Sequence, residues 1–390
     1  MKKRIFYILM ALFILFVGAL SVFTCSHFGF DKISAYFSRF VYENEFSEDK
    51  PMSTYYFDKL TGKEKSAYIT VFNEIRKHPE FIKVPELTND EFNNVFFAVK
   101  NDNPDFLCFA DHCNMISFWS ASFFQMTYSY DVSECENMTS EMMQIANEMI
   151  SDISVADEFE RELIIHDRMI NHCDYEETVN SSNAYGFFVE KKAVCSGYSR
   201  AAMILFNKLG INSFVITGIG ISAIEGKVNH MWNIVEISGK PYHVDVTWDD
   251  PVSDSDNFLS HMYFNLTDES ISIDHSDFNS SYTCTEPEYN YFVFNNTLYD
   301  EYSDVTVNDI ADKLKINIQN GIYYIEFEFS DAEDYNTALG SMVNNSSSSS
   351  DMYKILNILG SDTAIDTSHV NFSMDDARRY IRLGFDVAQK

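Results

Sequence analysis

The middle of the chain predicts an α+β fold in which one helix packs on an antiparallel sheet. Residues 193–209 have helical spacing, and Gly210 stands at the C-cap position. Three apolar runs rich in β-branched and aromatic residues follow and indicate strands: 214–217, 230–237 and 241–248. Ser238-Gly239 separates the last two as a two-residue turn. A helix followed by consecutive strands favours this class over alternating βαβ units.

The composition fits a folded protein and excludes three other classes. A length of 390 residues predicts two or three domains. The chain is 46% hydrophobic and 15% aromatic, so it is not disordered. There are 28 Lys and Arg against 59 Asp and Glu, and the resulting net charge of −31 repels nucleic acid. Seven cysteines are too few for a disulfide scaffold, and their odd number leaves at least one thiol unpaired.

The N-terminus has the features of a targeting segment. Basic residues at 2–4 precede an uncharged, mostly apolar run over 5–25, which is long enough to cross a bilayer. The positive-inside rule keeps the basic end in the cytoplasm and places the rest of the chain outside. We therefore expect residues 1–27 to be a membrane anchor, or a signal peptide whose cleavage secretes the protein. A lipoprotein signal ending at Cys25 fits less well, because bulky side chains precede it where small ones are required.

Changes of pattern divide the following residues into three parts. Residues 28–52 end in a polar stretch that is typical of a stalk. Residues 53–150 follow mainly helical spacing, with an aromatic run at 116–130 that fits a strand. Residues 151–285 form the domain that contains the helix over 193–209 and the three strands. This domain begins with another helix, which carries His166 on its apolar face.

The last part, 286–390, is predicted to be a small α/β region. Apolar residues alternate with Glu326 and Glu328 over 325–329, the pattern of a half-buried strand. We therefore interpret these two glutamates as an exposed face and not as the carboxylate pair of a glycosidase. Two helices and a closing strand complete the region: 335–343, 352–359 and 380–387.

Cys195 stands where the helix over 193–209 should begin. The first N–H groups of a helix lack partners and its dipole is positive there, so a thiolate is favoured over a thiol. The same N–H groups could stabilise an oxyanion. Gly197 lets another chain segment or a substrate approach closely. The competing interpretation is a buried cysteine that acts as a small hydrophobe.

A histidine and a carboxylate are predicted to meet on the last two strands. A two-residue turn pairs residues whose numbers sum to 477, so His230 faces Thr247 and Asp245 lies diagonally on the same face. Diagonal Cα atoms are about 7–8 Å apart, within reach of a His–Asp hydrogen bond. A three-residue turn would put the two side chains on opposite faces. His243 is the alternative histidine, although it projects parallel to Asp245 from one strand.

Cys195, His230 and Asp245 supply, in that order, a nucleophile, a base and an orienting carboxylate. The motifs around them resemble the transglutaminase-like superfamily, a papain-like group of cysteine enzymes. The resemblance runs from about 158 to 277, and Ser196 departs from it because many members carry an acidic residue there. Its most specific pieces are Ala193-Val194-Cys195-Ser196-Gly197-Tyr198, His230-Met231-Trp232-Asn233 and His243-Val244-Asp245-Val246-Thr247-Trp248-Asp249-Asp250-Pro251.

The resemblance implies a papain-like, transglutaminase-like core that works without a cofactor or metal. It implies that Cys195 is the nucleophile, His230 the general base and acid, and Asp245 the orienting carboxylate. The implied reaction is acyl transfer, in which Cys195 attacks a carboxamide or peptide carbonyl and an amine or water resolves the thioester. The backbone N–H of Cys195 would hold the oxyanion, and Asn183 or Tyr185 is predicted to supply a second donor.

Three further groups of polar residues are expected to have structural roles. Cysteines and a histidine within 108–113 could hold a metal or form a disulfide, but no second pair follows at zinc-site spacing, so buried thiols are expected. His166 is expected to be a hydrogen-bonded core histidine. Asp249 and Asp250 could bind calcium, but a turn-capping role before Pro251 is expected.

The function we expect is that of a transglutaminase-like cysteine enzyme outside the cytoplasm. Its partners would be a protein or cell-wall peptide substrate, and the membrane through the N-terminal helix, with protease or amidase action ahead of cross-linking. The alternatives are a non-enzymatic surface binding module that keeps the fold, and a structural surface protein with the core as a spacer. A reactive, exposed Cys195 would favour the enzyme.

Overall fold

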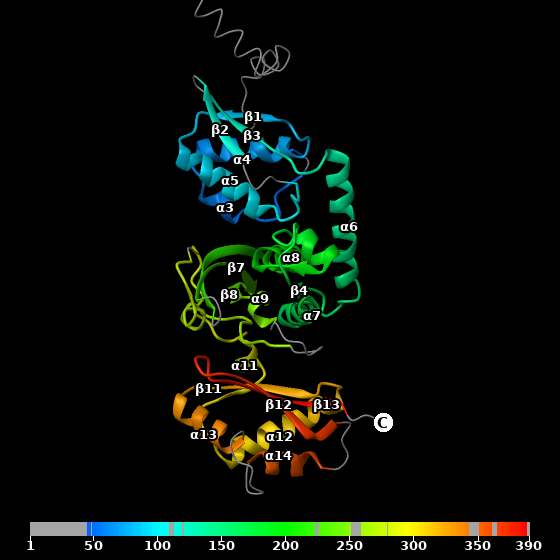
Figure 1. The fold of residues 1–390 in the computed structure, drawn as a ribbon. Coiled ribbons are helices and arrows are strands. Elements are labelled where there is room, and N and C mark those ends of the chain that lie inside the picture. Colours follow the sequence, from blue (N-terminus) through cyan, green and yellow to red (C-terminus); the bar gives the residue numbers. More distant parts are fainter. Residues whose placement is uncertain are drawn as a thin grey trace, which may run out of the picture. The chain divides into compact units, whose positions relative to one another are not determined.

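The computed structural model describes residues 45–47, 49–108, 113–118, 121–222, 226–250, 259–278, 280–342, 351–360 and 365–387 (Figure 1). The chain divides into two compact units, Met1–Glu134 and Cys135–Lys390. Within the described ranges, no helix has the length and apolarity that a membrane crossing needs. The predicted anchor and most of the predicted stalk lie outside those ranges.

The first unit packs helices against a three-stranded antiparallel sheet of order β1–β3–β2. Its elements are α3 (Tyr55–Lys59), α4 (Gly62–Ile75), β1 (Phe81–Pro85), α5 (Asn89–Asp102), β2 (Cys113–Phe118) and β3 (Ala121–Met126). Capping boxes start α4 at Thr61 and α5 at Thr88, because each threonine accepts from an amide three residues on. Buried aromatic residues such as Phe72 and Phe124 fill the space between helices and sheet. The aromatic run 116–130 contains the end of β2 and all of β3.

The second unit places one long helix on a four-stranded antiparallel sheet, as the sequence predicts. After α6 (Val132–Ile150), which begins just before the division, its first helices are α7 (Glu158–Ile170) and α8 (Cys195–Lys208). The sheet has the order β8–β7–β6–β9, and α8 packs on β6 and β7. Its strands are β6 (Ser213–Ser222), β7 (Gly226–Ile237), β8 (Lys240–Val244) and β9 (His275–Ser276). A π-helical turn (Gly186–Glu190) and the short parallel pair β4 (Asp174–Tyr175) and β5 (Lys192–Ala193) lead into α8.

The predicted register of the β7–β8 hairpin is confirmed. Ile237 pairs with Lys240 and Asn233 with Val244, so paired numbers sum to 477. Ser238 and Gly239 both have positive φ, 52° and 75°, as a two-residue turn of the I′ type requires. The prediction of a strand over 241–248 is wrong at its end, because β8 stops at Val244 and a short helix α9 (Val246–Asp249) follows.

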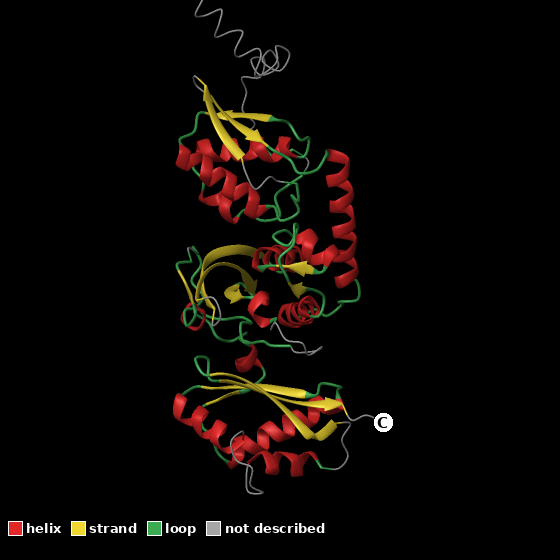
Figure 2. Ribbon diagram, viewed as in Figure 1, coloured by secondary structure: helices red, strands yellow, loops and turns green. Residues whose placement is uncertain are grey.

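A mixed sheet with helices on one face forms the C-terminal part of the second unit (Figure 2). The sheet order is β10–β11–β13–β12, and the strands are β10 (Leu298–Tyr299), β11 (Tyr324–Phe329), β12 (Ile365–Asp375) and β13 (Tyr380–Val387). The helices are α10 (Asp268–Ile271) and α11 (Tyr291–Phe294) before the sheet, then α12 (Asp304–Gln319), α13 (Ala332–Met342) and α14 (Asp351–Leu359). The closing strand has the predicted range.

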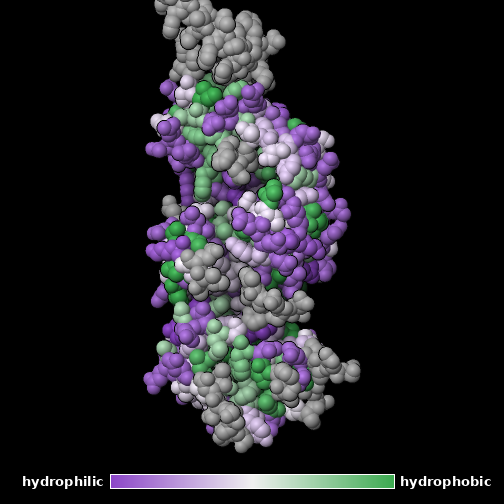
Figure 3. Space-filling model, in the orientation of Figure 1, coloured by the Kyte–Doolittle hydropathy of each residue, from purple (hydrophilic) through white to green (hydrophobic). Residues whose placement is uncertain are grey.

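Hydrophilic residues cover much of the face drawn in Figure 3, as 59 acidic residues lead one to expect. Inside the C-terminal part, however, Glu326 and Asp351 are buried and Glu328 is half-buried. Glu326 is 2% exposed on β11, so the prediction that it belongs to an exposed face is wrong. Its partners are His261 and the Tyr380 hydroxyl.

Candidate active site

Cys195 is the first residue of α8 and carries a free, half-buried thiol. The preceding residue, Val194, has extended backbone angles and provides no side-chain cap, while its carbonyl accepts from the amides of Gly197 and Tyr198. The amides that open a helix have no partner within it, so they remain donors beside the sulfur. A Cβ on Gly197 would lie 2.3 Å from the Ser181 carbonyl oxygen. The expected close approach at Gly197 is therefore made by the chain's own preceding loop.

His230 and Asp245 form a buried pair. His230 lies on β7, and its Nε2 is 2.6 Å from Oδ2 of Asp245. Asp245 reaches the ring from the N-cap of α9, where its Oδ1 accepts from the amides of Thr247 and Trp248 at 3.1 and 3.3 Å. The predicted partnership is present, but the route differs from the predicted diagonal strand pair. The cap holds one carboxylate oxygen and leaves the other for the imidazole.

His243, the alternative histidine, is fully buried and has other partners. Its Nδ1 accepts from the Trp232 indole N–H at 3.0 Å, and its Nε2 lies 2.8 Å from Oδ1 of Asp268. An indole nitrogen only donates, so Nε2 of His243 carries the proton that Asp268 accepts. The structure therefore brings His230, and not His243, to Asp245.

Electrostatics favour the imidazolium form of His230. Burial alone would lower its pKa, but the Asp245 charge and hydrogen bond, together with a hydrogen bond from Cys195, raise the pKa to about 10. Burial would likewise raise the pKa of Asp245, yet the His230 charge lowers it below its ordinary value. Because Nε2 of His230 faces Asp245, its Nδ1 is left for the Cys195 sulfur.

Glycines on β6 make room for the aromatic walls of this pair. A Cβ on Gly220 would lie 2.7 Å from the Trp248 ring, and one on Gly218 would lie 2.7 Å from the Trp232 ring. The Trp232 and Trp248 rings lie 5.8 and 5.1 Å from the His230 ring, measured between centroids. The two indoles therefore contribute apolar surface next to the imidazole.

Cys195 and His230 line one open cavity of about 510 Å³. The other lining residues are Ser196, Thr217, Gly218, Ile219, Asn229, Met231 and Asp277. The two predicted oxyanion donors are not among them. Asn183 Oδ1 accepts from the amides of Tyr185 and Gly186, and the Tyr185 hydroxyl donates to Glu141 at 3.1 Å. Both side chains have partners that do not involve the cavity.

Asp245 has a further partner that the sequence did not reveal. His275 Nε2 lies 3.1 Å from Oδ2 of Asp245, and His275 Nδ1 lies 2.6 Å from Oδ1 of Asp274. Asp274 in turn binds Arg378, from the β12–β13 turn, through two hydrogen bonds of 3.1 and 2.8 Å. The strand that carries His275 has two residues, so no alternation in the sequence marks it.

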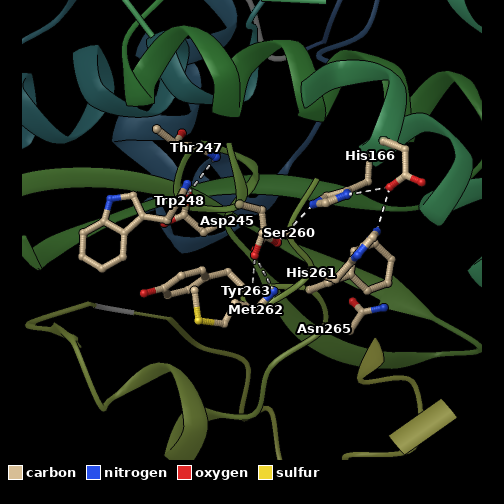
Figure 4. A network of polar contacts seen from close by, with 12 residues as sticks. His166, Asp245, Thr247, Trp248, Ser260, His261, Met262, Tyr263 and Asn265 are labelled. Carbon is tan, nitrogen blue, oxygen red and sulfur yellow. Dashed lines mark hydrogen bonds and ion pairs between the residues drawn. The ribbon is translucent and has the colours of Figure 1, made fainter. Parts of the chain in front are cut away.

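A second polar network lies beside the pair and includes His166 and His261 (Figure 4). His166 Nε2 is 3.1 Å from Asp249 and its Nδ1 3.3 Å from Asp167, so the prediction of a hydrogen-bonded core histidine is confirmed. His261 bridges Asp167 at 2.8 Å and Glu326 at 2.6 Å. Burial opposes the charge on His261, but these two carboxylates raise its pKa well above the ordinary value.

The side chain of Asp249 does not cap the turn before Pro251, which is the role that the sequence led us to expect, and binds more distant groups. Its Oδ1 accepts from the Tyr263 amide at 2.9 Å and from Ser260 at 3.3 Å, while its Oδ2 faces His166. Asp250 accepts from the Tyr198 hydroxyl. Both acidic side chains are thus occupied by protein donors.

Among the described residues of the second unit, three groups of donors lie close enough for a metal: His166–Asp167–His261, His230–Asp245–His275 and His243–Asp268–Cys284. In the first two, each ring nitrogen that approaches a carboxylate is at hydrogen-bond distance from it. In the third group, the Trp232 indole donates to Nδ1 of His243, so Nε2 of His243 carries a proton and cannot bind a metal. These contacts fit hydrogen bonding better than coordination.

The cysteines of 108–113 differ from both predictions for them. Cys108 is disulfide-bonded, as is Cys135, whereas Cys113 is a free half-buried thiol, so a Cys108–Cys113 disulfide is wrong. Burial raises the pKa of Cys113 to about 12. The intervening histidine lies outside the described residues. Cys173 and Cys284 are buried free thiols.

Comparison with known proteins gives one family match. The model of the transglutaminase-like superfamily matches residues 144–246, a range that contains Cys195, His230 and Asp245. No curated protein is significantly similar to the chain.

Among solved structures, a TGase is similar at 13% identity and a TM-score of 0.27, over 45% of this chain and 53% of its own. A proposed cysteine protease from Cytophaga hutchinsonii is similar at 14% identity and a TM-score of 0.25, over 35% and 61%. A proposed protease from Parabacteroides distasonis has 11% identity and a TM-score of 0.21, over 34% and 30%. The chain thus spans about half the length of the first and less than two thirds of the second.

Proposed function

We propose, from the match of residues 144–246 to the transglutaminase-like superfamily, that the protein is a cysteine enzyme that transfers acyl groups from peptides or carboxamides. The observation that carries the proposal is the shared cavity of Cys195 and His230, with His230 paired to Asp245. A non-enzymatic binding module has no need of a cysteine that lies beside a histidine paired with a buried carboxylate.

The arrangement supports a thioester mechanism. A raised His230 pKa favours transfer of the thiol proton to the imidazole, so Cys195 attacks the carbonyl as a thiolate. The carbonyl oxygen gains the negative charge beside the amide that opens α8. His230 then gives its proton to the departing nitrogen, and Asp245 keeps the ring oriented through both steps. Water or an amine, deprotonated by His230, attacks the thioester and releases Cys195.

Asn183 and Tyr185 stay predictions as second oxyanion donors. Their side chains would have to leave the partners described above to reach the carbonyl oxygen. Tyr185→Phe and Asn183→Ala test the roles one at a time. Loss of an oxyanion donor typically lowers kcat about 100-fold or more, whereas loss of a loop contact changes stability with kcat retained.

We further propose that the enzyme acts outside the cytoplasm on a protein or cell-wall peptide, anchored by residues 1–27 or secreted after their cleavage. Two observations support the location: the basic residues before the apolar run, and a disulfide-bonded Cys108, a state typical of oxidising compartments. Protease or amidase action is proposed first, and cross-linking is the other outcome of the substrate test. The acidic surface makes nucleic acid an unsuitable partner.

The decisive test is site-resolved alkylation by iodoacetamide at pH 6, followed by mass spectrometry. We expect Cys195 to label rapidly, because transfer of its proton to His230 leaves a thiolate. Ordinary thiols with pKa near 8.5 are almost fully protonated at pH 6 and label slowly. The free thiol of Cys113 in the same molecule is the internal control and should stay unlabelled. His230→Ala should slow the labelling of Cys195.

Equal labelling of Cys195 and Cys113 at pH 6 would contradict the enzyme and favour the surface binding module. If Cys195 is reactive, glutamine-containing peptides offered with and without a primary amine separate the reactions. Ammonia release with amine incorporation indicates cross-linking, and release or chain cleavage without incorporation indicates hydrolysis. Cys195→Ala should abolish each.

A further inference from the structure

Asp245 is held from two sides by groups of different origin. Its Oδ1 is fixed by local amides of α9, whereas its Oδ2 is shared by His230 at 2.6 Å and His275 at 3.1 Å. Asp245 and His275 are each 1% exposed, so no bulk water competes for these bonds. The position of Oδ2 therefore depends on His275 as well as on His230.

His275 depends on a connection to the C-terminal part of the chain. Its other nitrogen faces Asp274. The Arg378 guanidinium donates hydrogen bonds from Nε and Nη2 to the two carboxylate oxygens of Asp274. Such a two-bond grip fixes direction as well as distance. Asp274 receives a third bond from the Tyr263 hydroxyl at 2.9 Å.

Arg378 is built into this place. It is 5% exposed, its guanidinium lies 4.1 Å from the centre of the Tyr263 ring, and its Nη1 donates to the Ser270 carbonyl at 3.2 Å. The turn that carries it is fixed by a bond from its own amide to Asp375 Oδ1 at 2.8 Å. A solvent-facing arginine would have none of these contacts.

We propose that Arg378, acting through Asp274 and His275, positions the Asp245 carboxylate against His230, so that the C-terminal region completes the active site. Arg378 and His275 are positioning residues, because neither lines the cavity that holds Cys195. The inference rests on the function proposed above. It assigns the region 286–390 a role beyond the matched range 144–246.

The test is a double-mutant cycle on the full chain, read as the rate of Cys195 alkylation at pH 6. Arg378→Met should slow alkylation about tenfold, the size expected for weakening a hydrogen bond to a charged group. In the Asp245→Asn background the same change should have no further effect, because the group it positions is gone. Arg378→Lys, which keeps the charge and part of the grip, should restore part of the rate.

Arg382→Met is the matched control. Arg382 is also a buried arginine of the C-terminal sheet, 6% exposed, and it lies over the Tyr324 ring and not over Tyr263. It should leave the alkylation rate at the wild-type value even where it lowers the melting temperature. A merely structural role of Arg378 would make the two variants alike.

Each outcome bears on one proposal. The positioning role would be overturned if Arg378→Met slowed alkylation equally in both backgrounds. It would also be overturned if an Arg378→Met protein that unfolds cooperatively reacted at the wild-type rate. Neither outcome would contradict the proposed enzymatic function. If Arg378→Met does not fold, Tyr263→Phe, which removes one bond to Asp274, enters the cycle and should slow alkylation only where Asp245 is present. Unreactive Cys195 in the wild type would contradict the proposed function itself.

Discussion

The pairing of His230 with Asp245 makes a quantitative prediction for Asp245→Asn. The pKa of His230 rises from an ordinary value of 6.5 to about 10 in the folded protein. That shift of about 3.5 units corresponds to about 5 kcal/mol, and truncating one partner of a buried pair typically costs about 3–5 kcal/mol. We therefore expect Asp245→Asn to lower the free energy of unfolding at pH 7 by about 3 kcal/mol or more.

The sign of the pH dependence follows from the direction of each shift. The raised His230 pKa contributes stability that is fully present below pH 6.5 and is lost as pH rises through about 10. The lowered Asp245 pKa contributes stability above about pH 4 that is lost on further acidification. The difference between wild type and Asp245→Asn should therefore be largest near pH 4–6.5 and shrink toward pH 10.5.

The assay is denaturant unfolding of both proteins at pH 6, 8 and 10.5. Groups that titrate alike in the two proteins cancel in the difference. Asp268→Asn is the control: its partner His243 has a lowered pKa, mainly through burial, so only a hydrogen bond of about 1 kcal/mol is at stake. A stability difference for Asp245→Asn that stays constant from pH 6 to 10.5 would refute the ion pair.

Two further predictions concern packing and a buried charge. Gly197→Ala should destabilise by about 1–3 kcal/mol in thermal unfolding, because its Cβ would meet backbone at 2.3 Å, whereas Gly340→Ala in α13 meets nothing within 4 Å and should gain up to about 1 kcal/mol. Equal effects of the two would contradict the close approach. Glu326→Gln should destabilise by about 3 kcal/mol at pH 7, because the charge on His261 loses a buried partner. Glu328→Gln should be nearly neutral there, since burial raises the pKa of Glu328 to about 8 and most of it is already protonated; a large loss would show that it is ionised.

Local rules were sufficient where the structure depends on neighbours in sequence. The Ser238-Gly239 turn fixed the register of β7 and β8, because a two-residue turn admits one pairing and glycine accepts positive φ. Helical spacing and Gly210 likewise predicted a helix over 193–209, and α8 is observed there with its start two residues later, at Cys195. The fold class and the choice of His230 followed from these two elements.

Contacts between segments far apart in the chain could not be predicted from the sequence. Asp245 leaves its strand because its side chain caps α9, a local preference that competes with strand continuation and has no periodic signal. His275 lies on a two-residue strand, and Arg378 meets Asp274 from 104 residues away. Glu326 alternates with apolar residues as a solvent-facing residue would, and only His261 and Tyr380 reveal that it is buried.

The indole rings beside His230 also give the protein a built-in optical reporter. The sequence has three tryptophans, at 119, 232 and 248, and the first lies outside the described residues. Trp232 and Trp248 both lie within 6 Å of the His230 ring, centroid to centroid. A protonated imidazole quenches a neighbouring indole more strongly than a neutral one. The intrinsic fluorescence of the unlabelled protein should therefore follow the charge of the base, and the state of the active site can be read without a substrate.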